Sequence, residues 1–258
     1  MWKVLGGSVI GQSHLDSGTV CQDASGWWVS ESGVCAVVAD GAGSRPKSEQ
    51  GSALIVQTIL AWARDAMKEN QSPPVYEGLV AARQALEELS ANTEVPLGDY
   101  ASTVAVVLVD QHVIQVGQVG DCFVVMKKSD GSVETVSPPA RSEYVNETVF
   151  LTAIDWEQDL RASEALLDDV SGFCISSDGL QFDLLDDIAT GMPFVPFFDD
   201  AFTWATEESS GSEDLLSLVA RLGQQSHDDK SLILGVKGSP LASLPIEQRG
   251  IIDQPQQT

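Results

Sequence analysis

Apolar residues recur along this chain in two patterns, and segments of the two kinds alternate. Short apolar runs, rich in β-branched residues, predict buried strands over Val4–Ile10, Val34–Ala39 and Val170–Ser176. Longer segments over Ser48–Asn70 and Val75–Ala91 carry apolar residues at spacings of three and four, which predicts helices that bury one face. The length of 258 residues is enough for one large core of such elements, or at most two small ones.

The middle of the chain predicts a group of strands joined by tight turns. The candidate strands are Ser102–Val109, His112–Val116, Cys122–Lys127 and Val133–Val136, separated by short polar tips. Connections this short indicate antiparallel pairing, because a parallel crossover needs a dozen or more residues. The segment that follows, Pro138–Asp169, is polar and irregular, and its length is typical of a functional flap.

The last part of the chain adds a helix over Glu213–Gln225 and a final strand over Ser231–Val236. Beyond Gly238 the sequence is rich in Pro and Gln and shows little periodicity. No Gly/Ser linker or internal repeat divides the chain. We therefore predict one folded domain over residues 1–237 and a loose tail over residues 238–258.

Composition narrows the class of protein. Apolar residues at 43% and charged residues at 20% exclude a disordered chain. No run approaches the roughly 20 apolar residues of a membrane span, and the apolar start of the chain reaches Gly6-Gly7 too early for a signal peptide. The four cysteines lie far apart in or beside apolar runs, which favours reduced, buried thiols. We expect a cytoplasmic monomer without membrane contact.

The net charge of −24 is unusual for this length. Between Asp155 and Asp214 the chain has sixteen acidic residues and one basic residue, Arg161. Such a surface repels nucleic acid and anionic lipid, and it favours cations and basic partners. Solubility alone explains most exposed acids, but a metal site needs only a handful of them.

Several acids stand next to the ends of predicted strands. Asp40, Asp121 and Asp178 follow apolar runs, the pair Asp228-Asp229 precedes the last strand, and Asp23 follows the first strand and a loop. Acids at strand ends can converge on one edge of a sheet, where hard divalent cations find the oxygen ligands they prefer. Two such cations could share a carboxylate and activate a bridging water for attack on phosphorus. Each Asp-Gly pair alone is also a common turn, so the ordered set carries the inference.

The ordered set resembles the protein phosphatase 2C family. The similarity extends over roughly residues 4 to 237, and the segments Gly11–His14 and Cys21–Ala24 are similar to the bacterial branch. It implies an α+β fold: a β-sandwich of two antiparallel sheets flanked by pairs of helices. The motifs, in chain order, are Asp40-Gly41-Ala42-Gly43, Ala101-Ser102-Thr103-Val104-Ala105, Val119-Gly120-Asp121-Cys122, Ser176-Ser177-Asp178-Gly179-Leu180 and Asp228-Asp229-Lys230-Ser231.

The resemblance also implies roles for single residues. Asp40 would bridge two Mn²⁺ or Mg²⁺ ions, and the Gly41 carbonyl would complete the coordination of one of them. Asp178 and Asp228 would bind the other ion, and Asp121 a third, weaker one. Asp23 would orient metal-bound water without touching the metal.

The chain departs from the family pattern in three places. The Arg that binds substrate phosphate is replaced in this region by His14, with Arg45 and Lys47 as alternative donors and a purely structural histidine as the other interpretation. Gln22 replaces the usual acid before Asp23; its amide can coordinate a cation but adds no charge, so one metal site is expected to be modestly weaker. An acid often found four residues after the Asp178 equivalent is Phe182 here, with Asp183 one further on, which puts the third ion in doubt.

The resulting hypothesis is a metal-dependent protein phosphatase that hydrolyses phosphoserine and phosphothreonine through metal-activated water. Its partners would be a phosphorylated protein and an opposing serine/threonine kinase. No Cys-x5-Arg nucleophile loop is present, which agrees with hydrolysis without a phosphoenzyme. Three alternatives remain at this level: an inactive phosphatase-like binding module, a hydrolase of small phosphoesters, and a structural protein whose aspartates are solvated turns.

Overall fold

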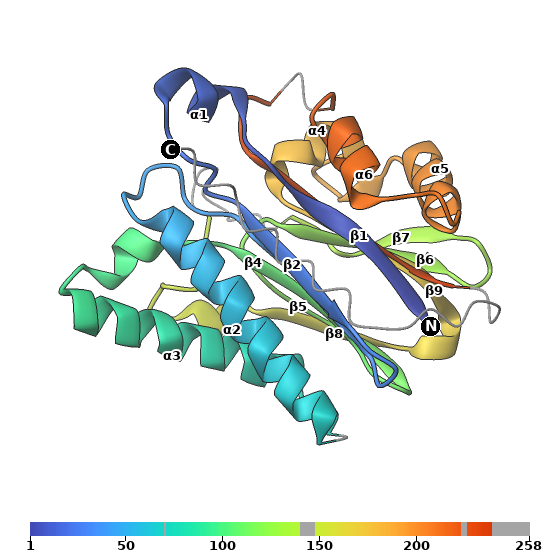
Figure 1. Cartoon of the computed structure of the whole chain (residues 1–258), viewed down its shortest axis with the longest axis horizontal. Coiled ribbons are helices and arrows are strands. Elements are labelled where there is room, and N and C mark those ends of the chain that lie inside the picture. Colours follow the sequence, from blue (N-terminus) through green and yellow to red (C-terminus); the bar gives the residue numbers. More distant parts are fainter. Residues whose placement is uncertain (70, 140–147, 223–225, 239–258) are drawn as a thin grey trace.

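The computed structural model describes residues 1–69, 71–139, 148–222 and 226–238 of the chain. The tail predicted beyond residue 237 therefore lies, except for Gly238, outside the described residues. Two five-stranded antiparallel sheets pack face to face (Figure 1). The first has the order β1-β12-β9-β6-β7 and the second the order β2-β3-β4-β5-β8.

The strands of the first sheet are β1 (Trp2–Val9), β6 (Phe123–Lys128), β7 (Val133–Ser137), β9 (Val170–Ser176) and β12 (Lys230–Lys237). Those of the second are β2 (Ala24–Val29), β3 (Val34–Ala39), β4 (Val104–Val109), β5 (Val113–Val119) and β8 (Arg161–Leu166). Side chains of both sheets form the central core, among them Val38, Val107, Met126 and Phe173, each at most 1% exposed. The two-sheet architecture predicted from the sequence is confirmed.

Helices cover the outer face of each sheet (Figure 1). α2 (Ser48–Lys68) and α3 (Val75–Thr93) pack on the second sheet, and α5 (Val195–Ala205) and α6 (Ser212–Val219) pack on the first. The apolar stripe of α2 lies inward because its residues recur at spacings of three and four, with Ile55, Ile59 and Ala63 fully buried. Burying such stripes gives each sheet a second core on its outer side.

Short elements complete the described chain. The short helices are α1 (Gln12–Ser17), η1 (Leu97–Tyr100), η2 (Trp156–Gln158), η3 (Leu167–Asp169), η4 (Asp178–Leu180) and α4 (Gln181–Leu184). Between α4 and α5 in the sequence, β10 (Leu185–Asp187) and β11 (Met192–Pro193) form a small two-stranded sheet.

Two expectations about the middle of the chain were wrong in part. β4 pairs with β5 and β6 with β7, as predicted, but β5 and β6 belong to different sheets. The short link at Gly120–Cys122 crosses from one layer to the other, which a hairpin interpretation misses. Within the predicted flap, residues 140–147 lie outside the described part, and β8 is an ordered edge strand paired with β5. Most of the side chains of β8 are exposed, so the sequence carries no alternating apolar signal there.

Candidate active site

Strand ends of both sheets meet at one end of the sandwich. In the second sheet Ala24 pairs with Ala39, so that Asp23 and Asp40, the residues next to this pair, lie at the same edge. In the first sheet Ser176 pairs with both Phe123 and Leu232, which brings the segments around residues 121, 178 and 228 together. The acids that the sequence scatters over the chain are therefore gathered by strand register.

Three carboxylates form the centre of this end, and we call them the acidic cluster: Asp40, Asp121 and Asp178. One carboxylate oxygen from each lies within 4.8 Å of the other two. Asp40 follows β3, Asp178 follows β9, and Asp121 stands at the crossing from β5 to β6. All three side chains are partly buried, and together they offer oxygen ligands to one cation or to two close ones.

The pKa values of the acidic cluster are raised. Burial raises the pKa of Asp178 to about 7, and the charges of Asp121 and Asp228 add to the effect. Burial and then the charge of Asp23 hold the pKa of Asp40 well above its ordinary value. Burial also raises the pKa of Asp121. Carboxylates crowded without a compensating cation disfavour ionisation, and a bound divalent cation removes that cost.

Polar groups around the acidic cluster fix the positions of Asp40 and Asp121. The backbone carbonyl of Asp40 accepts hydrogen bonds from the Thr103 backbone N–H and the Ser102 hydroxyl, both at 2.8 Å. The Thr148 hydroxyl donates to Oδ2 of Asp121 at 2.8 Å. The motif Ala101-Ser102-Thr103 thus acts as a support for Asp40, a role that its sequence did not reveal.

Asp23 lies beside the acidic cluster but is more deeply buried, at 6% exposure. Its Oδ2 accepts a hydrogen bond of 2.8 Å from the Ser177 hydroxyl, and Ser177 precedes Asp178 in the chain. Burial raises the pKa of Asp23 to about 7, against the opposing effect of the Ser177 hydrogen bond. This position suits the predicted role of a carboxylate that orients water next to the metal ligands.

The neighbouring acids Asp228 and Asp229 differ in burial. Asp228 is exposed, outside the acidic cluster, yet its charge acts on both Asp40 and Asp178. Asp229 is 3% exposed and accepts backbone hydrogen bonds of 2.6 Å from the N–H groups of Gly11 and Gln22.

His14 is bound to the same buried carboxylate. Nδ1 of His14 lies 2.9 Å from Oδ2 of Asp229, so the ring is held next to the start of β12. The imidazole is half-buried, with 15% of its side chain exposed. Asp229 therefore anchors the start of α1, the short helix that carries His14, which the sequence alone did not indicate.

Two glycines are required by the geometry of this end. Gly120 has φ +98°, and a Cβ there would lie 2.6 Å from Cβ of Thr103. A Cβ on Gly179 would lie 2.0 Å from the backbone oxygen of Asp229. The glycines next to Asp121 and Asp178 thus serve close chain approach, and at Gly120 also a left-handed backbone.

The residues present fit a hard divalent cation. The clustered donors are carboxylate oxygens with raised pKa values, and Oε1 of Gln22, beside Asp23, is buried without a hydrogen-bond partner among the described residues. The four cysteines are free, buried and outside the acidic cluster, which agrees with the predicted reduced thiols. An all-oxygen donor set of this kind suits Mg²⁺ or Mn²⁺ better than zinc or copper.

Comparison with known proteins decides the family. Residues 10–220 match the family described as protein phosphatase 2C. The chain belongs to this family. It is 26% identical over 253 residues to serine/threonine-protein phosphatase 3 of Escherichia coli, an alignment covering 91% of this chain and 98% of that protein.

Solved structures with low sequence identity share the phosphatase 2C fold. The serine/threonine phosphatase Stp1 from Staphylococcus aureus superposes with a TM-score of 0.61 at 14% identity, over 93% of this chain and 96% of that one. PppA of Pseudomonas aeruginosa gives 0.59 at 19% identity, over 91% and 97%. The class of activity predicted from the sequence, a metal-dependent protein serine/threonine phosphatase, is confirmed.

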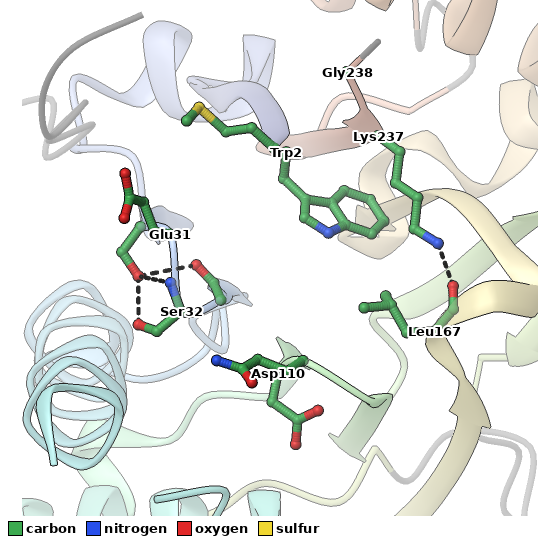
Figure 2. A pocket seen from close by; sticks show the side chains of 11 residues that line it. Trp2, Glu31, Ser32, Asp110, Leu167, Lys237 and Gly238 are labelled. Atoms are coloured by element: carbon green, nitrogen blue, oxygen red, sulfur yellow. Dashed lines mark hydrogen bonds between the residues drawn. The ribbon is translucent and has the colours of Figure 1, made fainter. Parts of the chain in front are cut away.

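A cavity of this phosphatase lies at the end of the sandwich opposite the acidic cluster, and Figure 2 shows the side chains that line it. It has a volume of about 420 Å³. In the first sheet it is lined by Trp2 at the start of β1 and Lys237 at the end of β12, and in the second by Glu31 and Asp110, which lie in the turns after β2 and β4. None of its lining residues belongs to the acidic cluster. No described helix is long and apolar enough to cross a lipid bilayer.

Proposed function

We propose that this phosphatase 2C protein hydrolyses phosphoserine and phosphothreonine in proteins with two Mn²⁺ or Mg²⁺ ions at the acidic cluster. The observation that supports this most directly is the convergence of Asp40, Asp121 and Asp178 to within 4.8 Å at the end of a phosphatase 2C fold. When bound, such ions supply charge neutralisation at the phosphoryl oxygens and lower the pKa of a coordinated water.

Among the ligands, Asp40 would lie between the two ions, with the Gly41 carbonyl beside it. Asp178 and Asp228 would hold the second ion, and Asp121 a third. The burial of Asp40, its contact with Asp178 and the nearby charge of Asp228 support these roles. Because carboxylate oxygens of Asp40, Asp121 and Asp178 all lie within 4.8 Å of one another, Asp121 would also be within reach of the central pair of ions.

Two further residues would act on water and substrate. Asp23, fixed by Ser177 and buried behind the acidic cluster, would orient the attacking water. His14 would donate to the substrate phosphate through Nε2, because its Nδ1 faces Asp229. This division leaves Asp229 as a support and makes His14 the replacement for the Arg of other family members.

The cellular setting follows as part of the same proposal. The substrate is a phosphorylated protein, an opposing serine/threonine kinase supplies it, and the enzyme works as a monomer in the cytoplasm. The catalytic domain spans residues 1–237. The main metal-binding aspartates of the family pattern, Asp40, Asp178 and Asp228, are present, so no observation favours the inactive binding module, and none favours small phosphoesters as the natural substrate.

The test is Mn²⁺-dependent phosphate release from a phosphothreonine peptide. We expect EDTA to abolish activity, and Asp40→Asn or Asp178→Asn to lower kcat by about 100-fold or more, since each removes charge at the reacting phosphoryl group. Asp186→Asn, which removes an exposed carboxylate eight residues beyond Asp178, serves as the matched control and should retain activity. A folded, Mn²⁺-binding protein that releases no phosphate from any phosphopeptide or small phosphoester would overturn the proposal.

A further inference from the structure

A pocket of about 400 Å³ is formed by two segments that are close in the chain to Asp23 and Asp40. One wall comes from the loop before β2 and the other from the segment between Asp40 and α2. Its lining includes Gln22 on the first wall and Gly43, Arg45 and Glu49 on the second.

The chain connects this pocket to the predicted metal ligands. Gln22 immediately precedes Asp23, and Gly43 stands three residues after Asp40. The two walls are joined because the backbone N–H of Gly41 donates to the carbonyl of Gln22 at 3.2 Å. No carboxylate of the acidic cluster lines the pocket, so it is not part of the metal site.

Arg45 is unusual among the basic residues of this acidic protein. In the described part of the chain, every other lysine and arginine except Lys47 donates a side-chain hydrogen bond or forms an ion pair. Arg45 does neither within the described residues, and its side chain is exposed on the pocket wall. In a protein of net charge −24, this guanidinium, without a partner among the described residues, stands near the proposed active site.

The surroundings of Arg45 favour an anion. Lys47 follows two residues later, and α2, a helix of 21 residues, begins at Ser48, so that its positive N-terminal turn borders the pocket through Glu49. The one carboxylate on the pocket wall, Glu49, accepts a hydrogen bond of 3.3 Å from Gln50. The planar guanidinium fork matches the oxygens of a phosphate or carboxylate.

We propose that Arg45 binds an oxyanion of the substrate in this pocket. The inference rests on the proposed phosphatase function and adds a substrate-binding residue to it. The oxyanion is either the phosphoryl group itself or the carboxylate of a residue next to the phosphothreonine. The two sources share their chemistry and differ in which substrates depend on Arg45.

The experiment compares kcat and KM of wild type, Arg45→Ala, Arg45→Lys and Arg64→Ala. The last variant removes an arginine on α2 whose side chain is 43% exposed, so it controls for the loss of one positive charge. Each enzyme is assayed with Mn²⁺ on p-nitrophenyl phosphate, on a phosphothreonine peptide flanked by Glu, and on the same peptide flanked by Gln. Melting temperatures confirm that the variants fold.

We expect Arg45→Ala to lower kcat/KM by about 10- to 100-fold, mainly through KM, with partial recovery in Arg45→Lys. Loss on all three substrates identifies the phosphoryl group as the ligand, whereas loss confined to the Glu-flanked peptide identifies the flanking carboxylate. If Arg45→Ala stays within twofold of Arg64→Ala on every substrate, the inference is wrong although the phosphatase function stands.

A binding measurement separates the two proposals if the wild type proves inactive. Calorimetric titration of the Mn²⁺-loaded wild type and of Arg45→Ala with the Glu-flanked phosphopeptide then gives the contribution of the pocket as the difference in affinity. Binding that Arg45→Ala weakens supports the inference without the phosphatase function. Absence of binding, or equal binding by both proteins, overturns it.

Discussion

Replacing Asp178 by asparagine is expected to stabilise the metal-free protein and to remove most of its stabilisation by Mn²⁺. Both effects have the same origin, which is the crowding of carboxylates at one end of the sandwich. Burial and the charges of Asp121 and Asp228 oppose ionisation of Asp178. A bound cation would instead favour the ionised carboxylate. Compared with the wild type, the variant should therefore be more stable without metal and should gain less stability from Mn²⁺.

The size of the first effect follows from the two pKa values of this side chain. Its pKa is about 7 in the folded protein and about 3.9 in an unfolded chain. At about 1.4 kcal/mol per pH unit between these values, the ionised group costs at most roughly 4 kcal/mol above pH 7. An uncharged amide still needs hydrogen-bond partners, so we expect a gain of about 1–3 kcal/mol and a rise in Tm of several degrees.

The pH dependence has a definite sign. Between about pH 4 and 7 the folded protein binds more protons at Asp178 than the unfolded chain does, so its stability falls as the pH rises. Below about pH 4 the group is protonated in both states and the penalty is absent. The difference between the variant and the wild type should thus be small at pH 4 and reach its full value above pH 7.

The assay is thermal unfolding, followed by circular dichroism from pH 4 to 8, in EDTA and with saturating Mn²⁺. At a hundredfold excess over Kd the metal should stabilise the wild type by about 2.7 kcal/mol, and the variant far less. Asp186→Asn should behave like the wild type in both conditions. A lower Tm of Asp178→Asn in EDTA at pH 8 would refute the electrostatic reasoning, and an undiminished response to Mn²⁺ would place the ion elsewhere.

Three further predictions concern the same end of the molecule. Mn²⁺ affinity should rise between pH 5 and about 7 and then level off, because raised pKa values make protons compete with the ion; calorimetry in buffers of different ionisation enthalpy should detect proton release below pH 7. Gly120→Ala should cost about 2–4 kcal/mol in urea unfolding, since it adds a clash with Thr103 to a strained backbone. Gly131→Ala, with φ +91° but open space around the Cβ, should cost clearly less, and equal costs would show that the clash is relieved. Ser177→Ala removes a hydrogen bond to Asp23 and should raise the pKa of that carboxyl further. The acidic limb of the pH profile of kcat/KM should then move upward by about one pH unit. If the limb does not move, the ionisation of Asp23 does not limit kcat/KM.

Much of the site could be predicted because its acids stand next to recognisable strands. Val34–Ala39 and Val170–Ser176 coincide with β3 and β9, and the acids that follow them meet as expected. Which carboxylate completes the acidic cluster was less predictable. It depends on the crossing between β5 and β6, where Gly120 turns the chain from one sheet to the other and brings Asp121 inward.

The parts that the sequence did not reveal depend on long-range contacts or on weak local patterns. The bond from His14 to Asp229 joins residues 215 positions apart, so no spacing rule could suggest it. Helix α5 was missed because Asp199 and Asp200 interrupt its apolar pattern, although Pro196 stands in its first turn as helix starts often have. The predicted helix at 213–225 begins near Ser212 as α6 but ends at Val219, while residues 223–225 lie outside the described part.

The acidic cluster draws its members from both layers of the sandwich. Asp40 extends from the second sheet and Asp178 from the first, while Asp121 belongs to the link between them. A cation shared by these residues would link two layers whose facing surfaces pack mainly through apolar side chains, with a few hydrogen bonds such as those of Ser8 with Ser25 and Ser177 with Asp23. Filling the site should then slow amide hydrogen exchange in strands of both sheets together, and emptying it should let the layers open as separate cooperative units.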